Sequence, residues 1–167
     1  IDASAIQVKQ SGAPAPEQTL IFGWNSRGPA IVRELDNYVA PGSHTTIVSN
    51  VADIAEQIGQ TKNQTGTFQQ GDITDRALLE SLNVPSFNHI IVLGYSDDLD
   101  MQEADAHTLI TLLHLRDMSE HAGKDFSIVS EMLDVRNRQL AEVTRADDFI
   151  VSDQLVSLLL AQVSENK

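Results

Sequence analysis

The sequence predicts an α/β fold: a Rossmann-type, doubly wound, mainly parallel sheet of six strands with helices on both faces. Short apolar runs, typical of strands buried on both faces, recur six times along the chain. A segment with helical spacing of its apolar residues follows each run. Because crossovers between parallel strands are right-handed, this alternation favours the strand order 3-2-1-4-5-6.

Each expected strand is a short run rich in apolar or β-branched residues. The first, Thr19 to Phe22, ends at Gly23, and the run from His89 to Leu93 is the clearest of them. The expected strands cover residues 19–22, 45–48, 66–71, 89–93, 126–129 and 149–151.

Helices are expected between the strands, with local signals at several of their ends. Pro29 stands near the start of the first, where its missing N–H does no harm, and Gly59 suits the C-cap of the second. We expect Tyr38 to share the apolar face of the first helix and Ala77 to point inward on the third, and the fourth carries Ile110 and Leu113 among its apolar residues. The expected helices cover residues 28–39, 51–59, 74–82, 101–118, 135–144 and 153–163.

The domain organisation follows from composition. Residues 1–18 contain two prolines among small residues and predict a linker, whereas residues 19–167 form one domain that includes an apolar C-terminal helix, 153–165. Because the chain opens with Ile1 rather than Met, we expect it to be a piece of a longer protein.

Charge and composition exclude several classes of function. The net charge of -13, from 24 acidic and 11 basic residues, repels phosphate backbones, so nucleic acid is not an expected partner. The chain has no cysteine, which excludes disulfides and thiolate metal sites and fits a cytosolic setting. No apolar run approaches the ~20 residues of a membrane helix, and no signal peptide is visible.

The loop after the first strand has the context of a phosphate-binding turn. It runs from Gly23 to Gly28, opens a helix, and carries the cationic Arg27. Two departures from a dinucleotide pattern stand against this: Asn25 replaces the middle glycine, and Asn50 replaces the ribose-binding acid. Alternatively, the glycines serve only the turn and helix packing. The candidate ligand-binding residues are Gly23, Trp24, Asn25, Ser26, Arg27, Gly28, Asn50 and Asp72, of which Asp72 could instead cap a helix.

A cluster of acids follows the fourth strand. Asp97, Asp98, Asp100 and Asp105 are candidate ligands for Ca²⁺, because hard cations need clustered oxygens. The alternative is that these carboxylates only favour the N-terminus of the following helix.

Catalytic pairs are not apparent. Tyr38 and Tyr95 are not followed by lysine at the fourth position, no thiol exists, and no serine lies in a G-x-S-x-G turn. The sequence therefore indicates a binding fold and not an enzyme, although an NAD(P)-dependent oxidoreductase is the alternative that the fold leaves open.

Four segments resemble Castor/Pollux-type ion channels. They read LIFGWN at 20–25, LLHLRD at 112–117, IVSEMLD at 128–134 and DFIVSDQLVS at 148–157. The similarity covers residues 18–167 and extends through the helix from Asp98 to Asp117.

The resemblance implies an RCK domain, a regulator of potassium conductance on the cytoplasmic side of a membrane. Such domains pair through terminal helices into dimers and gating rings, and their crevice binds a nucleotide such as NAD, or Ca²⁺. The membrane-spanning channel portion would lie outside this chain. A ligand would act by favouring one dimer geometry over another, and a ligand-free assembly lobe is the alternative.

Overall fold

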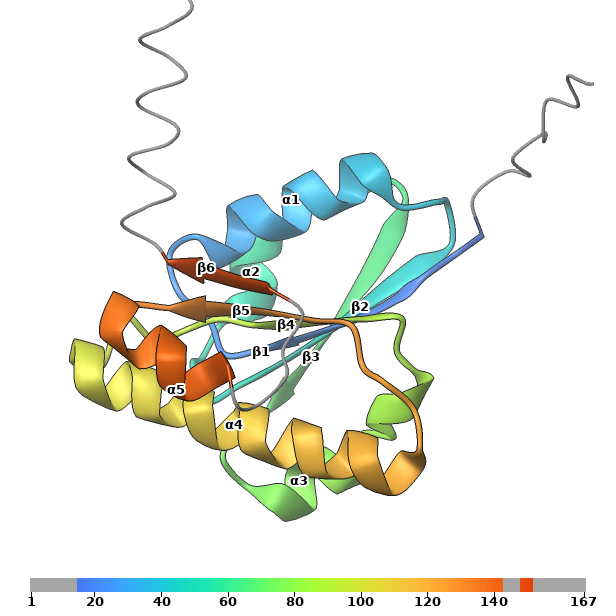
Figure 1. Cartoon of the computed structure of the whole chain (residues 1–167). Coiled ribbons are helices and arrows are strands. Elements are labelled where there is room, and N and C mark those ends of the chain that lie inside the picture. The colour runs from blue at the N-terminus through green and yellow to red at the C-terminus, as the bar shows by residue number, and fades with distance from the viewer. Residues whose placement is uncertain (1–14, 143–147, 152–167) are drawn as a thin grey trace, which may run out of the picture.

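A computed structural model describes residues 15–142 and 148–151 of the chain. All five strand pairings are parallel, and the six strands follow the order β3-β2-β1-β4-β5-β6 (Figure 1), which confirms the predicted Rossmann-type sheet. The strands are β1 (Gln18–Phe22), β2 (Ser43–Ser49), β3 (Gln64–Gln70), β4 (His89–Val92), β5 (Ile128–Met132) and β6 (Asp148–Val151). The helices are α1 (Gly28–Tyr38), α2 (Ile54–Ile58), α3 (Arg76–Ser81), α4 (Met101–Ala122) and α5 (Arg138–Glu142), with short 3₁₀ turns at Val84–Ser86 and Val135–Asn137.

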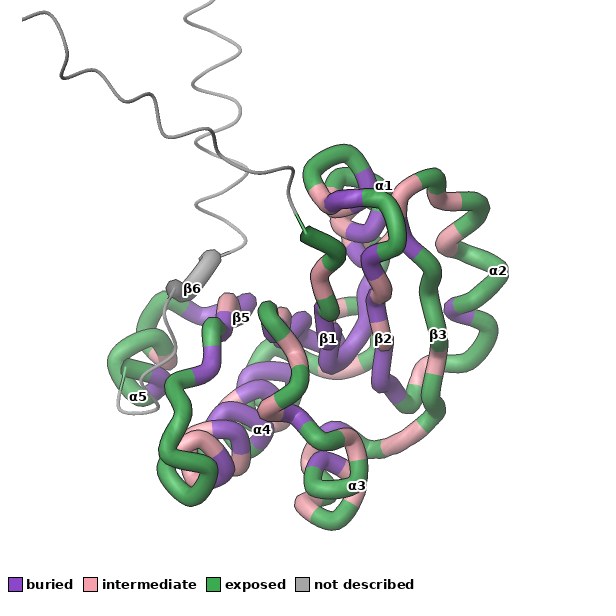
Figure 2. Tube along the Cα trace, turned by 90° about the vertical axis from the view of Figure 1, so that its right-hand side faces the viewer, coloured by how far each residue is buried: buried purple, intermediate pink, exposed green. Residues whose placement is uncertain are grey.

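The helices lie in two layers. Figures 1 and 2 show α1 and α2 on one face of the sheet and α3, α4 and α5 on the other. Side chains alternate between these layers along each strand, so Leu20 and Phe22 pack toward α4 while Ile21 packs toward α1. The central strands are consequently buried on both faces, as Figure 2 shows.

Several expected boundaries differ from the structure for identifiable reasons. The fifth strand begins at Ile128 rather than at residue 126, and it continues through the buried polar residues Ser130 and Glu131, which an apolar pattern does not include. The second helix is shorter than expected, because Asp53 adopts a left-handed φ of 59° just before it. The fourth helix extends to Ala122 and stops at Gly123, whose φ is 60°. The expected helix 153–163 and the linker residues 1–14 lie outside the described residues.

Several apolar side chains of the predicted helices are exposed. Tyr38 is 82% exposed, Ile110 and Leu113 are 41% and 50% exposed, and Ala77 also faces solvent. On α4 the buried positions include Thr108 and Thr111, whose hydroxyls donate to backbone carbonyls and so lose no hydrogen bond on burial. The buried face of α4 therefore includes polar side chains, while two of its apolar side chains face solvent.

A buried carboxylate joins α1 to the loop before β3. The two carboxylate oxygens of Asp36 accept hydrogen bonds from the backbone N–H groups of Lys62, Asn63 and Gln64, at 2.8, 2.8 and 3.1 Å. Burial by itself would raise the pKa of Asp36, but the three backbone N–H bonds together lower it below its ordinary value.

Replacing Asp36 by asparagine is expected to cost about 2 kcal/mol of unfolding free energy at pH 7, since an amide cannot accept all three bonds. The lowered folded-state pKa means that Asp36 stabilises the fold above the unfolded pKa of about 4, and that this contribution is lost as the pH falls through the folded value. Urea unfolding between pH 7 and pH 3 should therefore show the two proteins converging in acid. The exposed Glu34 on the same helix provides the control, since Glu34→Gln should change stability by less than about 0.5 kcal/mol; an Asp36→Asn deficit that persists unchanged in acid would contradict the assignment.

Candidate functional site

The predicted nucleotide-binding residues gather at one edge of the sheet. The turn from Gly23 to Gly28 follows β1, Asn50 follows β2 and Asp72 follows β3. These strands are parallel neighbours, so their carboxyl ends meet, and the strand order reverses between β1 and β4 at the same place. Ligands of open α/β sheets bind outside such a reversal.

Both glycines of the turn are required by close packing. Gly23 has a φ of 77°, and a Cβ there would overlap the carbonyl oxygen of Leu93. A Cβ on Gly28 would lie 2.7 Å from the indole of Trp24. That indole is 1% exposed, and its Nε1 donates to Oε1 of Gln57 at 2.9 Å. Trp24 thus packs between α1 and α2.

Asn25 points into the sheet edge. Its side chain is buried, and Nδ2 donates to the carbonyl oxygen of Gly94 at 2.7 Å and to Oε2 of Glu131 at 2.8 Å. Its Oδ1 accepts from the backbone N–H of Arg27 at 3.0 Å. The residue in the middle-glycine position therefore connects the ends of β1, β4 and β5.

Glu131 is a functional candidate that the sequence reasoning missed. Its carboxylate is buried, lies 2.5 Å from Nη2 of Arg27, and accepts from the backbone N–H of Gly94 at 3.1 Å. Nη2 of Arg27 also donates to Oγ of Ser96 at 3.2 Å. The available signal was an acid inside an otherwise apolar strand, since a buried charge requires a partner.

Asp97 bonds the residue that precedes the N-cap of α1, which is Arg27. Its Oδ2 accepts from the backbone N–H of Ser26 at 2.5 Å, and its Oδ1 accepts from the Ser26 hydroxyl at 3.2 Å. The first turn of α1 has no acidic residue of its own. Asp97 therefore supplies the negative charge that the helix dipole favours at this end.

Tyr95 is hydrogen-bonded to the end of β2. Its ring is buried, and its hydroxyl accepts from the backbone N–H of Asn50 at 3.3 Å and from Oγ of Ser49 at 3.4 Å. Burial raises the pKa of the Tyr95 phenol. The ring of His107 meets it edge-on, with centroids 5.9 Å apart.

Asp72 forms hydrogen bonds within its own loop. Its Oδ1 accepts from the backbone N–H and the hydroxyl of Thr74, at 2.9 and 2.7 Å, and these two bonds lower the pKa of Asp72. The helix cap itself is Asp75, which accepts from the N–H of Ala77.

The four predicted metal ligands do not share one site, and three of them accept hydrogen bonds from different parts of the domain. Asp97 binds the turn, Asp98 is exposed, and Asp100 caps α4 by accepting from the N–H groups of residues 102 and 103. Asp105 is 1% exposed and accepts from the N–H groups of Leu133 and Asp134 and from Nδ2 of Asn137. Within residues 15–142 and 148–151, no three His, Asp or Glu side chains gather as a metal site requires. The Ca²⁺ site stays a prediction.

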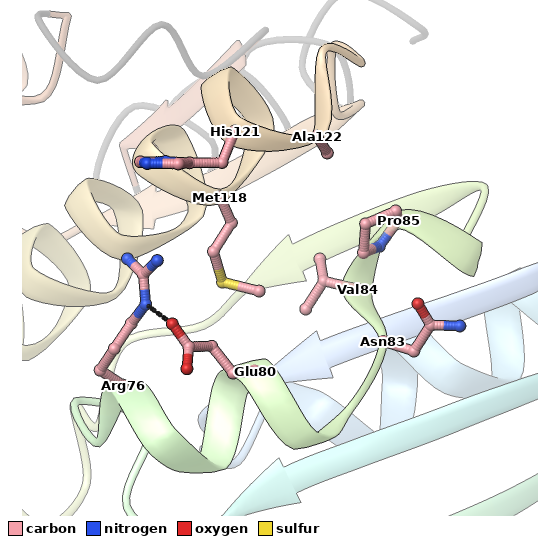
Figure 3. A pocket seen from close by; sticks show the side chains of 8 residues that line it. All are labelled: Arg76, Glu80, Asn83, Val84, Pro85, Met118, His121 and Ala122. Carbon is pink, nitrogen blue, oxygen red and sulfur yellow. Dashed lines mark hydrogen bonds and ion pairs between the residues drawn. The ribbon is translucent and has the colours of Figure 1, made fainter.

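A cavity of about 310 Å³ lies elsewhere, between α3 and the end of α4 (Figure 3). Its apolar lining includes Val84, Pro85 and Met118, and Arg76 at its rim is paired with Glu80 and Asp117. Because α4 runs back from the carboxyl edge to the amino edge of the sheet, this cavity lies away from the glycine turn, and none of the predicted site residues lines it.

No helix among the described residues has both the length and the apolar character that crossing a membrane demands.

Sequence relatives agree with the resemblance to Castor/Pollux-type channels. The chain is 27% identical over 191 residues to the probable ion channel CASTOR of Oryza sativa subsp. japonica, covering 92% of the chain and 21% of that protein. It is 27% identical over 190 residues to the probable ion channel POLLUX of Arabidopsis thaliana, covering 91% and 23%. The chain thus spans about a fifth of the length of the relatives that it matches.

Solved structures share the fold at low identity. The NAD(P)-binding domain of an exopolyphosphatase-related protein from Archaeoglobus fulgidus matches with a TM-score of 0.68 at 16% identity, covering 90% of this chain and 99% of that one. GsuK bound to ADP matches with a TM-score of 0.58 at 17% identity, covering 82% and 31%, and the GsuK channel bound to NAD with 0.57 at 18%, covering 81% and 21%.

Family membership rests on a match that spans nearly the whole predicted domain. Residues 19–152 match the TrkA-N domain, from the first strand through the sixth. The match includes the turn after β1 and the ends of β2 and β3, so it contains every residue placed at the carboxyl edge above. The chain belongs to the TrkA-N domain family.

Proposed function

We propose that this chain is the regulatory, RCK-type domain of an ion channel, and that an adenine nucleotide binds at the carboxyl edge of its sheet. One observation carries the proposal: the turn Gly23 to Gly28, Asn50 and Asp72 follow adjacent strands at the point where the strand order reverses. The relatives named as ion channels, and the structural neighbours named as bound to ADP or NAD, support the same assignment.

The domain acts by changing populations and not by catalysis. A nucleotide that binds one arrangement of a dimer or gating ring better than another shifts the balance between them by that difference in affinity. The domain covers residues 19–167, and its apolar segment 153–165 pairs with a second copy, while residues 1–18 connect it to the rest of the protein. The membrane-spanning part lies outside this chain, and the domain works on the cytoplasmic side.

A second candidate is an assembly lobe that binds no ligand. The observation in its favour is that the N–H of Ser26, the N–H of Arg27 and the guanidinium of Arg27 are already bonded within the domain. Such a domain would dimerise without responding to any nucleotide.

Thermal unfolding of the chain with ADP, ATP, NAD⁺, NADH, Mg²⁺ or Ca²⁺ separates these candidates. A ligand at a hundredfold excess over its Kd stabilises the folded state by about 2.7 kcal/mol, which raises the melting temperature by several degrees. We expect such a rise with an adenine nucleotide in the wild-type chain and in Asn37→Phe, an exposed site on α1, but not in Asn50→Phe at the end of β2. Equal rises in melting temperature in both variants would show that the nucleotide binds elsewhere than at the end of β2. The absence of a rise with any nucleotide would support the assembly lobe that binds no ligand.

A further inference from the structure

At the carboxyl edge of the sheet, one segment of the chain supplies hydrogen-bond partners to the turn after β1 and to the end of β2. Residues 93–100, here called the β4–α4 loop, connect β4 to α4. Tyr95, Ser96 and Asp97 of this loop each contact the turn after β1 or the end of β2.

In the first contact, Asp97 of the loop bonds the groups of Ser26 that would otherwise be available to an anion. Ser26 directly precedes Arg27, the N-cap of α1. In a nucleotide-binding turn, the backbone N–H groups just before and at the start of the following helix bind a phosphate group. Here that group is the carboxylate of Asp97, which accepts from both the N–H and the hydroxyl of Ser26. A phosphate cannot reach the N–H of Ser26 while Asp97 holds it, because both are anions and both accept the same hydrogen.

In a second, independent contact, the cationic side chain of Arg27 is paired with the carboxylate of Glu131. Arg27 is the one basic residue between Gly23 and Gly28, and its Nη2 lies 2.5 Å from the carboxylate of Glu131. Glu131 is 7% exposed and is also held by Asn25 and the N–H of Gly94. The two groups that would bind a pyrophosphate are therefore each paired with an internal carboxylate, from two different elements.

The third contact closes the nucleoside side. The Tyr95 hydroxyl lies 3.3 Å from the backbone nitrogen of Asn50, at the strand end where a ribose hydroxyl would bind. The backbone N–H of Asn50 is therefore already bonded to a buried side chain, and a ribose hydroxyl could use this N–H only after Tyr95 moves.

We propose that the β4–α4 loop is an internal competitor for the nucleotide site, and that Asp97 lowers the affinity of this site for phosphate-bearing ligands, which bind tightly only when the loop withdraws. This rests on the proposed nucleotide site. Asp100 of the same loop caps α4, so withdrawal of the loop also disturbs the start of the longest helix of the domain. Ligand binding is thereby coupled to α4 without a separate hinge.

The test is isothermal titration of the wild-type chain, Asp97→Ala and Glu103→Ala with inorganic pyrophosphate and with ADP at one fixed ionic strength. Asp97→Ala should bind both ligands about tenfold or more tightly than wild type, since it frees the N–H and hydroxyl of Ser26 to donate to the ligand anion and removes a like charge. Glu103→Ala removes the same charge from an exposed position on α4 and should leave both affinities within about twofold of wild type. Asp97→Asn keeps the shape of the side chain and should give a smaller gain; it replaces the alanine variant if the latter does not fold.

The outcomes distinguish the two proposals. If Asp97→Ala gains pyrophosphate affinity while the wild-type chain responds to no nucleotide, the competitor is established and nucleotide regulation fails. If the wild-type chain binds ADP and Asp97→Ala binds it no more tightly, the nucleotide site stands and the internal competitor is overturned. Equal gains in Asp97→Ala and Glu103→Ala, or no binding to any of the three proteins, would also overturn it.

Discussion

Replacing Asp105 by alanine is expected to cost about 3–5 kcal/mol of unfolding free energy. The carboxylate is 1% exposed and accepts three hydrogen bonds, from the N–H groups of Leu133 and Asp134 and from Nδ2 of Asn137. Alanine leaves these donors buried without acceptors and also frees the segment after β5 from α4. Urea unfolding measures the loss, and hydrogen exchange should show faster exchange of the amides of residues 133 and 134.

The same measurement decides between two roles for Asp105. Glu103→Ala, two residues away on the exposed face of α4, should cost less than about 0.5 kcal/mol. A loss in Asp105→Ala that is equal in Ca²⁺ and in EDTA fits the structural role. A loss that appears only in Ca²⁺ would instead make Asp105 a metal ligand, as the acid cluster in the sequence suggests.

Replacing Gly23 by alanine is expected to cost a similar amount, about 3–5 kcal/mol, from two additive causes. The φ of 77° costs an L-residue about 1–2 kcal/mol, and the new Cβ would overlap the carbonyl oxygen of Leu93 unless β1 and β4 move apart. The change is measured by urea unfolding, with soluble yield and circular dichroism as the readout if the variant does not fold.

Gly123→Ala is the matched control for Gly23. Gly123 has a φ of 60°, but nothing lies within 4 Å of a Cβ placed there. It should therefore cost only the backbone strain, about 1 kcal/mol. Similar losses at the two glycines would show that β1 and β4 are not packed as closely at Leu93 as described.

The fold was largely predictable from the sequence because its signals are local. Apolar runs separated by amphipathic segments determine the alternation of strands and helices, and the handedness of crossovers limits the order of the strands. Side-chain direction within a helix was less predictable. Tyr38 was expected on the apolar face of α1 but is exposed. Asp36 on the same helix is buried, because three backbone N–H groups donate hydrogen bonds to its carboxylate.

The candidate site was predictable in position but not in its contacts. Sequence position placed Asn25, Asp97 and Asp105 after β1 and β4, near the carboxyl edge. It could not show that Asn25 turns toward Glu131, that Asp97 reaches across to Ser26, or that Asp105 faces β5. These partners lie 28 to 106 residues apart in the chain, so they follow from tertiary packing and not from local pattern.

Trp24 gives the domain an optical reporter at the glycine turn. It is the single tryptophan of the sequence, and its buried indole packs against Gly28 and donates a hydrogen bond to Gln57. All tryptophan emission therefore originates from the turn after β1, without added labels and without background from other parts of the chain. Any event that shifts the start of α1 against α2 changes the packing of this one indole, so rearrangements of the turn can be followed in real time by stopped-flow fluorescence.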